Sequence, residues 1–185
     1  ILNQPIGKQD QVPAVYGGLN FISFNKNDTV KITNIKKDKI YNNLFKKSIL
    51  IWTQSTRSAS EVLKNQKKNL KLNINRLEKI KANADIFYQS IKLNKKIDLK
   101  KLGNLVNNSW EEKKKLSGKI SLEKIDTIIK NAISLGCYGS KLLGAGGGGF
   151  ILYLGKKNNK IFKNYIYEDV KIYNNGSEII TLQKD

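Results

Sequence analysis

The chain has 185 residues, and its 34 Lys and Arg against 15 Asp and Glu give a formal net charge of +19 at pH 7. No apolar run approaches the ~20 residues that a membrane-spanning helix needs, and the first residues lack the pattern of a signal peptide. With no His and one Cys, neither an internal disulfide nor an all-protein zinc site is expected. We therefore expect a cytoplasmic protein with no membrane partner and no metal held by its own side chains alone.

The positive charge comes almost entirely from lysine, because Arg57 and Arg76 are the only arginines. Arginine is the residue that suits bidentate contacts with phosphates and bases. The lysines occur in short clusters along the whole chain, which is typical of solvated helix faces. We therefore expect no nucleic-acid partner, whereas an anionic small substrate would need only a few well-placed lysines.

Three strands are predicted in the first third of the chain. Residues 17–24 (GGLNFISF) and 29–35 (TVKITNI) are joined by the polar turn NKND. Residues 48–54 (SILIWTQ) form a short apolar run that predicts a buried strand. Ser58 and Glu61 then have the spacing of a capping box, which predicts the start of a helix.

Three further helices are predicted from apolar residues spaced to lie on one helical face. They run from Ile74 to Ile91, from Leu102 to Leu116 and from about Ser121 to Ile133. The last ends at Gly136, a residue type that is common just past a helix C-terminus. We interpret each apolar stripe as core packing, including Trp110 in the second of the three.

The last part of the chain predicts a strand at 149–155 (GFILYLG) and a short helix around Phe162, Tyr165 and Ile166. Residues 169–182 then resemble two strands around an Asn-Gly turn. There is no internal repeat and no Pro/Ser-rich linker. The mixed order of strands and helices predicts an α+β fold, with a sheet on one side and helices on the other.

The stretch PIGKQDQVPAVYGG is not explained by packing. It places Asp10 between two glutamines, with Lys8 close by. In one interpretation Asp10 is an ordinary helix N-cap, with Pro13 in the first turn. In the other, its carboxylate is held at a helix start and directed into a cleft, where it could act on a proton. The stretch by itself leaves both interpretations open.

A second polar stretch lies where the strand at 48–54 leads into the next helix. It contains Ser55, Thr56, Arg57 and Ser58. Hydroxyls and an arginine at a helix N-terminus can form an anion site. Capping plus a surface arginine is the simpler alternative.

The glycine-rich stretch from Gly144 to Gly149 is interrupted only by Ala145 and leads directly into the apolar residues FILYL. A flexible linker would be followed by polar residues. Glycines that abut a strand instead favour a tight loop, whose bare backbone can come close to a ligand.

Together, the stretches GKQDQ…YGGLNFISF, WTQSTRSASEVLKNQ, LSGKIS and GSKLLGAGGGGFILYL resemble the C-terminal part of a GHMP-superfamily sugar kinase, over essentially the whole chain. The resemblance is greatest to the D-glycero-D-manno-heptose 7-phosphate kinase branch. It implies a two-layer α+β fold. Residues 1–54 would be the end of a ribosomal-S5-like N-terminal domain, and residues 55–185 a ferredoxin-like GHMP kinase C-terminal domain.

The resemblance also implies an activity. Such enzymes use Mg²⁺ and transfer the γ-phosphoryl group of ATP to a sugar hydroxyl. In the heptose branch the acceptor is the anomeric hydroxyl of the sugar 7-phosphate, in nucleotide-activated heptose synthesis for surface polysaccharide. A galactokinase- or fucokinase-type enzyme, or a non-catalytic module on the same fold, is the alternative.

The resemblance implies roles for individual residues. Asp10 would accept the proton of the acceptor hydroxyl or orient it, and Lys8 would favour the ionised form of Asp10 or of the acceptor oxygen. Arg57 would hold the substrate's own phosphate. The residues implied for substrate binding are Gln9, Gln11, Tyr16, Gly17, Ser55, Thr56, Arg57 and Lys141, and those implied for the glycine loop are Gly144, Ala145, Gly146, Gly147 and Gly148.

One departure from the family pattern concerns the ATP site. The superfamily's Pro-x-x-x-Gly-Leu-Gly-Ser-Ser-like loop and its N-terminal substrate motif do not occur in these 185 residues. The chain also begins at Ile1 and contains no Met. We therefore expect a fragment whose ATP loop lies upstream, with negligible kinase activity as an isolated chain.

Overall fold

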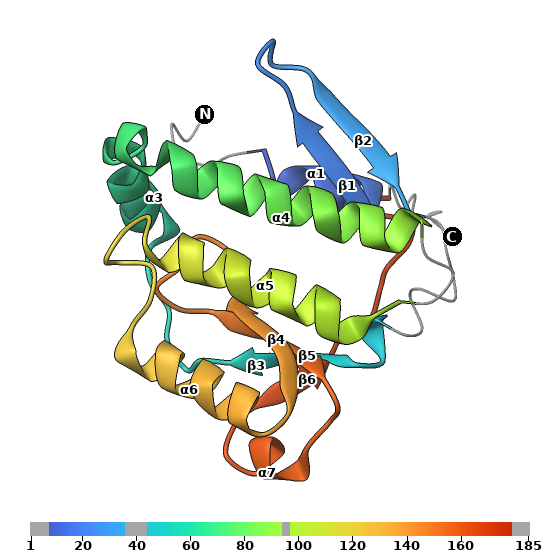
Figure 1. The fold of residues 1–185 in the computed structure, drawn as a ribbon, viewed down its shortest axis with the longest axis vertical. Coiled ribbons are helices and arrows are strands. Elements are labelled where there is room, and N and C mark those ends of the chain that lie inside the picture. The colour runs from blue at the N-terminus through green and yellow to red at the C-terminus, as the bar shows by residue number, and fades with distance from the viewer. Residues whose placement is uncertain (1–7, 36–43, 94–96, 179–185) are drawn as a thin grey trace, which may run out of the picture. The chain divides into compact units, whose positions relative to one another are not determined.

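The computed structural model describes residues 8–35, 44–93 and 97–178 (Figure 1). The chain divides into two compact units. The larger comprises Ile1–Ile6 and Lys39–Val170, and the smaller comprises Gly7–Asp38 and Lys171–Asp185. The boundary predicted between residues 54 and 55 comes from the resemblance to the kinase family and not from this division into two units, and it stays a prediction.

The smaller unit contains a short helix and a hairpin. Helix α1 (Gln11–Tyr16) is followed by strands β1 (Asn20–Phe24) and β2 (Val30–Asn34). The two strands pair antiparallel, with Asn20 opposite Asn34 and Phe24 opposite Val30. Both strands predicted from alternation are therefore confirmed, although the first begins three residues later than expected.

The predicted pair of strands at 169–182 is wrong for the residues that are described. Residues 170–178 contain no strand, and residues 179–182 lie outside the described part of the chain. The Asn-Gly turn packs on the end of α1 instead of closing a hairpin. A Cβ atom on Gly17 would lie 2.3 Å from the backbone nitrogen of Gly176. The Ser177 N–H donates to the Val15 carbonyl at 3.2 Å.

The larger unit is built on a four-stranded sheet. Its strands are β3 (Ser48–Trp52), β4 (Cys137–Leu142), β5 (Phe150–Gly155) and β6 (Tyr167–Asp169). They lie side by side in the order β4-β5-β3-β6, and every neighbouring pair is antiparallel. With helices between β3 and β4 and between β5 and β6, this is the β-α-β-β-α-β chain order of a ferredoxin-like fold. The predicted α+β class is confirmed.

Four α-helices of the larger unit lie between β3 and β4 in the chain, and one lies between β5 and β6 (Figure 1). They are α3 (Ala59–Lys68), α4 (Ile74–Leu93), α5 (Leu99–Lys114), α6 (Glu123–Ser134) and α7 (Asn159–Phe162), with a 3-10 turn, η1 (Lys71–Asn73), before α4. The long helices predicted from apolar spacing are confirmed. The short helix around Phe162 is smaller than expected, because Tyr165 and Ile166 follow its last residue.

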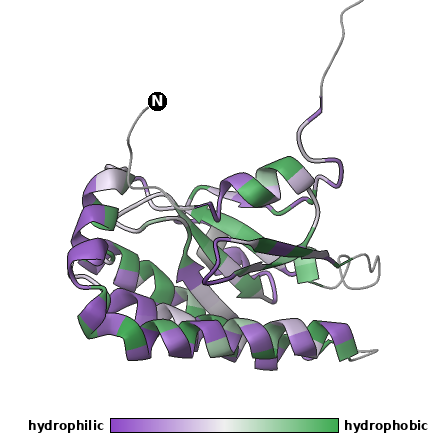
Figure 2. Ribbon diagram, turned by 90° about the horizontal axis from the view of Figure 1, so that it is seen from above, coloured by the Kyte–Doolittle hydropathy of each residue, from purple (hydrophilic) through white to green (hydrophobic). Residues whose placement is uncertain are grey.

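The hydrophobic core lies between the sheet and the helices of the larger unit. Ile49, Ile51, Ile151 and Tyr153 of the sheet are fully buried in one cluster with four residues of α6. Those four are Ile125, Ile128, Ile129 and Ala132. Trp110 of α5 joins this cluster with 1% of its surface exposed, so its predicted role as a core anchor is confirmed. The alternation of purple and green along the helices in Figure 2 shows the same division into polar and apolar faces.

Strand β4 was not expected, since no helix or strand is predicted between Gly136 and the glycine-rich stretch. Its pattern CYGSKL includes two small residues and lacks a clear apolar alternation. Tertiary contacts account for it, because α5 covers the outer edge of β4. The Asn107 side chain accepts from the Ser140 N–H at 2.9 Å and donates to the Tyr138 carbonyl at 3.1 Å. Gly103 of α5 makes this close approach possible, since a Cβ there would lie 2.3 Å from the Tyr138 backbone.

The start of α3 is where the capping box predicts it, but the capping box itself does not form. Ser58 occupies the N-cap position, and its side chain makes no capping hydrogen bond. The Glu61 carboxylate instead pairs with the Lys119 ammonium. The Glu61 carboxylate, which the capping box would place on the backbone at the helix start, is therefore used in a long-range ion pair.

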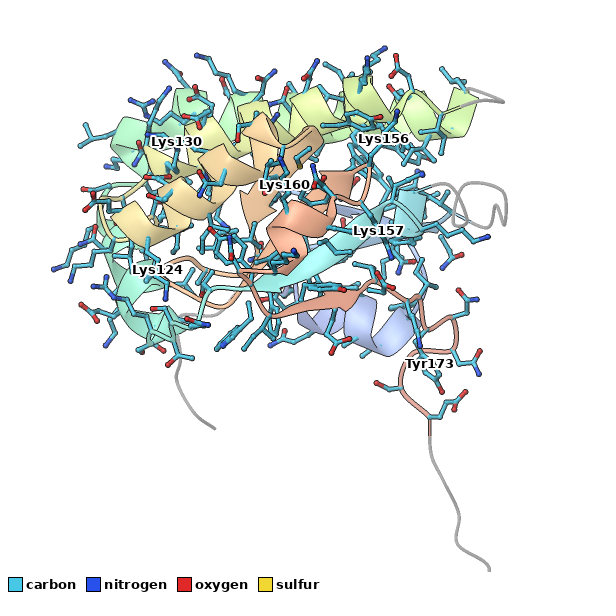
Figure 3. All side chains as sticks on the ribbon, turned by 90° about the horizontal axis from the view of Figure 1, so that it is seen from below. Lys124, Lys130, Lys156, Lys157, Lys160 and Tyr173 are labelled. Carbon is cyan, nitrogen blue, oxygen red and sulfur yellow. The ribbon has the colours of Figure 1, made fainter. Side chains whose placement is uncertain are left out.

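Most of the described lysines lie on the surface. Lys124, Lys130, Lys156, Lys157 and Lys160 are all exposed, and they project from α6, α7 and the segment after β5 (Figure 3). Within the described residues, no helix is long and apolar enough to cross a membrane.

Candidate functional site

The glycine loop between β4 and β5 is held by two segments that are distant in sequence. The Gly149 N–H donates to the Ser55 carbonyl at 2.8 Å, and the Gly147 N–H donates to the Ile120 carbonyl at 2.8 Å. The Gly149 carbonyl accepts from both the N–H and the hydroxyl of Thr53, at 3.0 and 2.7 Å. The loop therefore brings together the stretches QSTR, SGKI and GAGGGG.

At Gly147 and Gly148 of the loop the contacts are too close for a side chain. A Cβ atom on Gly148 would lie 2.4 Å from the Ser55 carbonyl oxygen. One on Gly147 would lie 2.9 Å from Cδ of Arg57, and Gly147 also has a positive φ of 78°. Gly148 therefore requires glycine for space, and Gly147 also requires it for its left-handed backbone. The loop is thus a packed element and not a linker.

Two helices fix the other side of the loop through its carbonyl groups. The Gln66 amide on α3 donates to the Ala145 carbonyl at 3.2 Å. The Lys113 ammonium on α5 donates to the Gly144 carbonyl. Beside Gln66, Asn65 accepts from the Ser117 hydroxyl at 3.0 Å, which ties α3 to the 117–120 turn as well.

With these bonds made, several backbone donors of the loop remain. Among the described residues, the N–H groups of Gly144, Ala145, Gly146 and Gly148 donate to no protein acceptor. Consecutive N–H groups in a loop of mixed left- and right-handed residues form a concave anion site. Gly144 and Gly146, with φ of 67° and 121°, supply the left-handed residues.

Positive side chains lie next to this loop. Arg57 is exposed, and its Cδ faces Gly147. Lys119 is paired with Glu61, and this hydrogen bond, more than the charges of Lys119 and Arg57, lowers the pKa of the Glu61 carboxyl. Lys124 donates to the side-chain oxygen of Gln54 at 3.4 Å. Gln54 is a non-glycine residue with a positive φ of 54°, so the chain turns sharply just before Ser55.

Lys141 lies in β4, three residues before the loop. Its neighbour Leu142 points into the core and is fully buried, so the Lys141 side chain projects from the opposite face of the sheet. Lys141 is half-buried, and the loss of hydration lowers the pKa of its ammonium group. Its role in holding a substrate phosphate stays a prediction.

Asp10 lies at the N-cap position of α1 in the smaller unit. Its side chain makes no capping hydrogen bond, because its backbone is helical, with φ of −91° and ψ of −28°. The capping interpretation is therefore wrong as far as the carboxylate is concerned, while Pro13 does lie in the first turn. The carboxylate is exposed and, among the described residues, has no ion-pair partner.

The other predicted residues of the smaller unit have mixed environments. Lys8 and Gln9 line a hollow, and Gln11 and Tyr16 are exposed. Gly17 is buried at the end of α1, and its close contact with Gly176 gives it a packing role. Since these residues belong to one compact unit and Arg57 and the glycine loop to the other, a shared substrate stays a prediction.

The sequence alone did not identify the residues that hold the loop. They are Thr53, Gln66, Lys113 and Ile120, and each acts through one or two hydrogen bonds to a backbone atom far away in the chain. No spacing rule reveals such contacts. Gln66 lies near the C-terminus of α3, where a polar side chain is common and does not indicate a contact with a distant loop.

The chain carries no ready metal cluster among its described residues, where no three Cys, Asp or Glu side chains could together hold an ion. This donor set does not by itself hold Mg²⁺. A magnesium ion that enters bound to nucleotide phosphates needs only one or two protein carboxylates. The exposed Asp10 carboxylate is compatible with that arrangement.

Comparison with known proteins identifies the class. Residues 90–166 match the family described as GHMP kinases C terminal. This match covers α5, α6, β4, the glycine loop and β5. Solved structures share the fold over most of the chain. A D-glycero-D-manno-heptose 1-phosphate kinase from B. thetaiotaomicron has a TM-score of 0.64 at 23% identity, over 95% of this chain and 50% of that one. Leishmania major mevalonate kinase has a TM-score of 0.60 at 22% identity, over 83% and 46%. The chain therefore carries a GHMP kinase C-terminal domain.

A more specific similarity is found with one curated protein. The chain is 31% identical over 150 residues to D-glycero-alpha-D-manno-heptose 7-phosphate kinase of Campylobacter jejuni. The match covers 80% of this chain and 43% of that kinase. The chain thus spans less than half the length of this relative.

Proposed function

We propose that the chain is the C-terminal portion of an ATP-dependent sugar kinase that phosphorylates the anomeric hydroxyl of D-glycero-D-manno-heptose 7-phosphate. The observation that carries this proposal is the 31% identity to a kinase with that printed substrate. The glycine loop, with its unpaired N–H groups and the adjacent Arg57, supports it as a site for phosphate.

Magnesium-bound ATP would supply the transferred phosphoryl group and part of the neutralising charge. Asp10 would then orient the acceptor hydroxyl and take its proton as the bond to phosphorus forms. Its freedom from a capping bond leaves the carboxylate oxygens available for that hydroxyl. Lys8, two residues earlier, would stabilise the negative charge that develops on the acceptor oxygen.

The larger unit would hold an anionic group of the substrate. Arg57 offers a planar fork of donors that suits a phosphate, and Ser55 and Thr56 add hydroxyl donors beside it. The N–H groups of the glycine loop add further donors, and they are free to bind an anion because no protein acceptor uses them. We assign the 7-phosphate of the sugar to Arg57 and these loop donors.

The proposal is tested by a coupled ATP-consumption assay on the full-length protein, with heptose 7-phosphate, galactose and fucose as acceptors. We expect turnover with the heptose phosphate at least ~100-fold above that with the other two. Preferred turnover of galactose or fucose would assign a different sugar kinase. No turnover of any sugar would favour a non-catalytic module.

A variant pair tests the assignment of Arg57. Arg57→Ala should raise KM for heptose 7-phosphate at least ~10-fold, since a charge-assisted bond to an anion is lost, and should leave KM for ATP unchanged. Arg76→Ala is the matched control, because Arg76 pairs with Glu112 at 3.5 Å on the helical layer. An equal effect of both variants would contradict the role of Arg57.

A further inference from the structure

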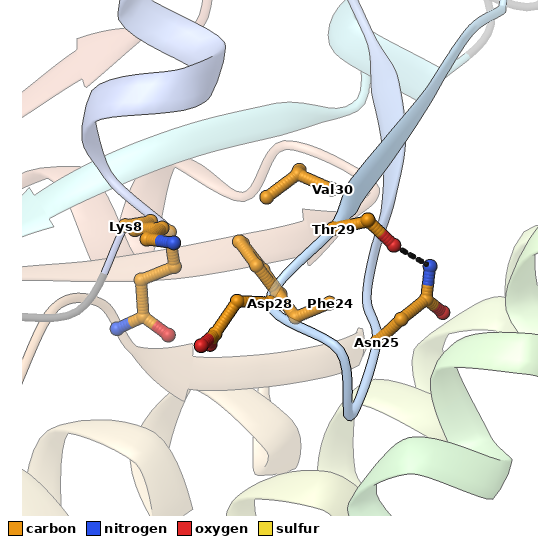
Figure 4. Close-up of a pocket in the computed structure, with 7 residues that line it drawn as sticks. Lys8, Phe24, Asn25, Asp28, Thr29 and Val30 are labelled. Carbon is orange, nitrogen blue, oxygen red and sulfur yellow. Dashed lines mark hydrogen bonds between the residues drawn. The ribbon is translucent and has the colours of Figure 1, made fainter.

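The smaller unit has a hollow of about 230 Å³ between the residues that precede α1 and the turn of the β1–β2 hairpin (Figure 4). It is lined by Lys8, Gln9, Phe24, Asn25, Asp28, Thr29 and Val30. Pockets for drug-sized ligands begin at ~300 Å³, so this hollow suits a smaller molecule such as one sugar ring.

The hairpin turn that forms one wall is fixed by its own hydrogen bonds. The Asn25 N–H donates to the Thr29 carbonyl at 2.9 Å, and the Asp28 N–H donates to the Asn25 carbonyl at 3.1 Å. The Asn25 amide also donates to the Thr29 hydroxyl at 3.0 Å, the bond drawn in Figure 4. These bonds hold Asp28 in a left-handed conformation with φ of 59°. None of them uses the Asp28 carboxylate.

The lining combines the groups that bind a polyhydroxylated ring. Phe24 is 50% exposed and offers an aromatic face for the apolar side of such a ring. The Asp28 carboxylate accepts hydrogen bonds from hydroxyl groups, and the Gln9 amide can both donate and accept. Lys8 lies on the other side of the hollow from Asp28 (Figure 4). Among the described residues these two charges form no ion pair, so both remain available to a ligand.

The hollow also lies beside Asp10, the proposed catalytic aspartate. Asp10 directly follows Gln9, so their Cα atoms are about 3.8 Å apart. We propose that this hollow binds the ring of the acceptor monosaccharide, with Phe24 under the ring and Asp28 on its hydroxyl groups. The inference rests on the proposed function for the identity of the sugar, and it adds Phe24 and Asp28 as residues that select it.

The test is a titration of the 185-residue chain with D-glycero-D-manno-heptose 7-phosphate, followed by amide NMR shifts, with inorganic phosphate as the comparison ligand. We expect the sugar phosphate to shift the amides of 8–9 and 24–30, and inorganic phosphate to leave them unmoved. Phe24→Ala should weaken binding at least ~10-fold. Tyr173→Ala is the matched control, because Tyr173 is an exposed aromatic residue of the same unit outside the hollow.

Asp28→Asn gives a second variant that preserves the turn, since asparagine tolerates a left-handed backbone. It should weaken sugar binding at least ~5-fold with an unchanged circular dichroism spectrum. Asp85→Asn on α4, also an exposed carboxylate, should have no effect. Unchanged binding in both Phe24→Ala and Asp28→Asn, or absence of sugar binding by the unaltered chain, would overturn the inference.

The transfer assay separates this inference from the proposed function. Normal transfer to the heptose phosphate by a full-length Phe24→Ala variant would overturn the hollow as the ring site and leave the kinase assignment intact. Sugar binding in the hollow without any transfer by the unaltered full-length protein would support the hollow as the ring site and contradict the kinase assignment.

Discussion

Cys137 is buried in the core at the start of β4. Its Sγ atom donates to the Gly139 carbonyl at 2.9 Å, and 7% of the residue's surface is exposed. Burial raises the pKa of this thiol to about 11. The thiolate is the reactive form, so this cysteine is inert in the folded protein.

The raised pKa of Cys137 predicts a loss of stability at alkaline pH. The unfolded chain releases the thiol proton from about pH 9, whereas the folded chain holds it until about pH 11. The contribution of Cys137 to the free energy of unfolding should therefore be constant below pH 9 and fall by about 2–3 kcal/mol as pH rises to 11, since one pKa unit equals ~1.4 kcal/mol. Urea unfolding of Cys137→Ala across this range should lack that fall.

A second buried group provides the control for this profile. Burial raises the pKa of Tyr153 to about 12, so its contribution is lost between about pH 10 and 12. Tyr153→Phe should keep the decline that begins at pH 9 and remove the later one. If the Cys137→Ala and unaltered profiles coincide, the thiol is not buried as the structure describes.

The addition of one methyl group at Gly148 tests how tightly the glycine loop is packed. Gly148 has an ordinary φ, but a Cβ atom there would lie 2.4 Å from the Ser55 carbonyl oxygen. Gly148→Ala should lower the free energy of unfolding by about 1–3 kcal/mol, as overpacking does. Gly118→Ala has open space for its Cβ and should change it by less than ~0.5 kcal/mol. Equal urea midpoints for the two variants would contradict the packing.

At the scale of elements, α3 acts as a support for the glycine loop. Its adjacent Asn65 and Gln66 bind the Ser117 hydroxyl and the Ala145 carbonyl, respectively. Because each bond joins α3 to a different turn, the helix fixes the turns relative to one another. The loop's shape thus depends on a helix about 80 residues earlier in the chain.

Removal of the Gln66 bond should loosen the loop without unfolding the protein. Gln66→Ala loses one hydrogen bond, which costs about 0.5–1.5 kcal/mol. Amide hydrogen exchange at 144–149 should accelerate, while exchange in β3 and β5 stays unchanged. Lys64→Ala, an exposed position on the same helix, serves as the control. Identical loop exchange in both variants would show that Gln66 does not hold the loop.

Periodicity in the sequence predicted most elements of the larger unit because their apolar faces are long and continuous. The four residues of α6 at 125, 128, 129 and 132 are an example, since they form a single buried stripe. Strand β4 lacked such a signal. Gly139 and Ser140 give it no apolar alternation, and its edge is completed by Asn107 on another element. The sequence signal was absent because the stabilising contacts are tertiary.

At the scale of the whole molecule, the core belongs to one of the two compact units. All fourteen residues of the main buried cluster, from Ile49 to Tyr153, lie within Lys39–Val170. Both tryptophans, Trp52 and Trp110, lie there too. We therefore expect this unit to contain most of the information needed for its own folding.

A chain cut to residues 39–170 should fold cooperatively. Its near-ultraviolet circular dichroism and its tryptophan emission should match those of the 185-residue chain, with one thermal transition. Leu142→Ala in the cut chain should lower its free energy of unfolding by about 2–5 kcal/mol, because Leu142 is fully buried. Loss of the cooperative transition in the unaltered cut chain would show that the smaller unit is needed for folding.

The sequence by itself determined the α+β class, the long helices and the glycine stretch, because apolar periodicity and glycine placement are local properties. It also singled out Asp10 and Arg57, although it left capping as an alternative for both. Only the tertiary structure decided that the Asp10 carboxylate is free of a capping bond and that Glu61 turns from its helix end to Lys119.

The tertiary structure also decided what surrounds the glycine loop. Ser55 and Ile120 accept hydrogen bonds from loop residues that follow them by 94 and 27 positions, respectively. Such contacts depend on how the strands and helices pack, which no local pattern encodes. The glycines were evident in the sequence. The reason for them, a backbone pressed against Ser55 and Arg57 with unpaired N–H groups left over, exists only in the fold.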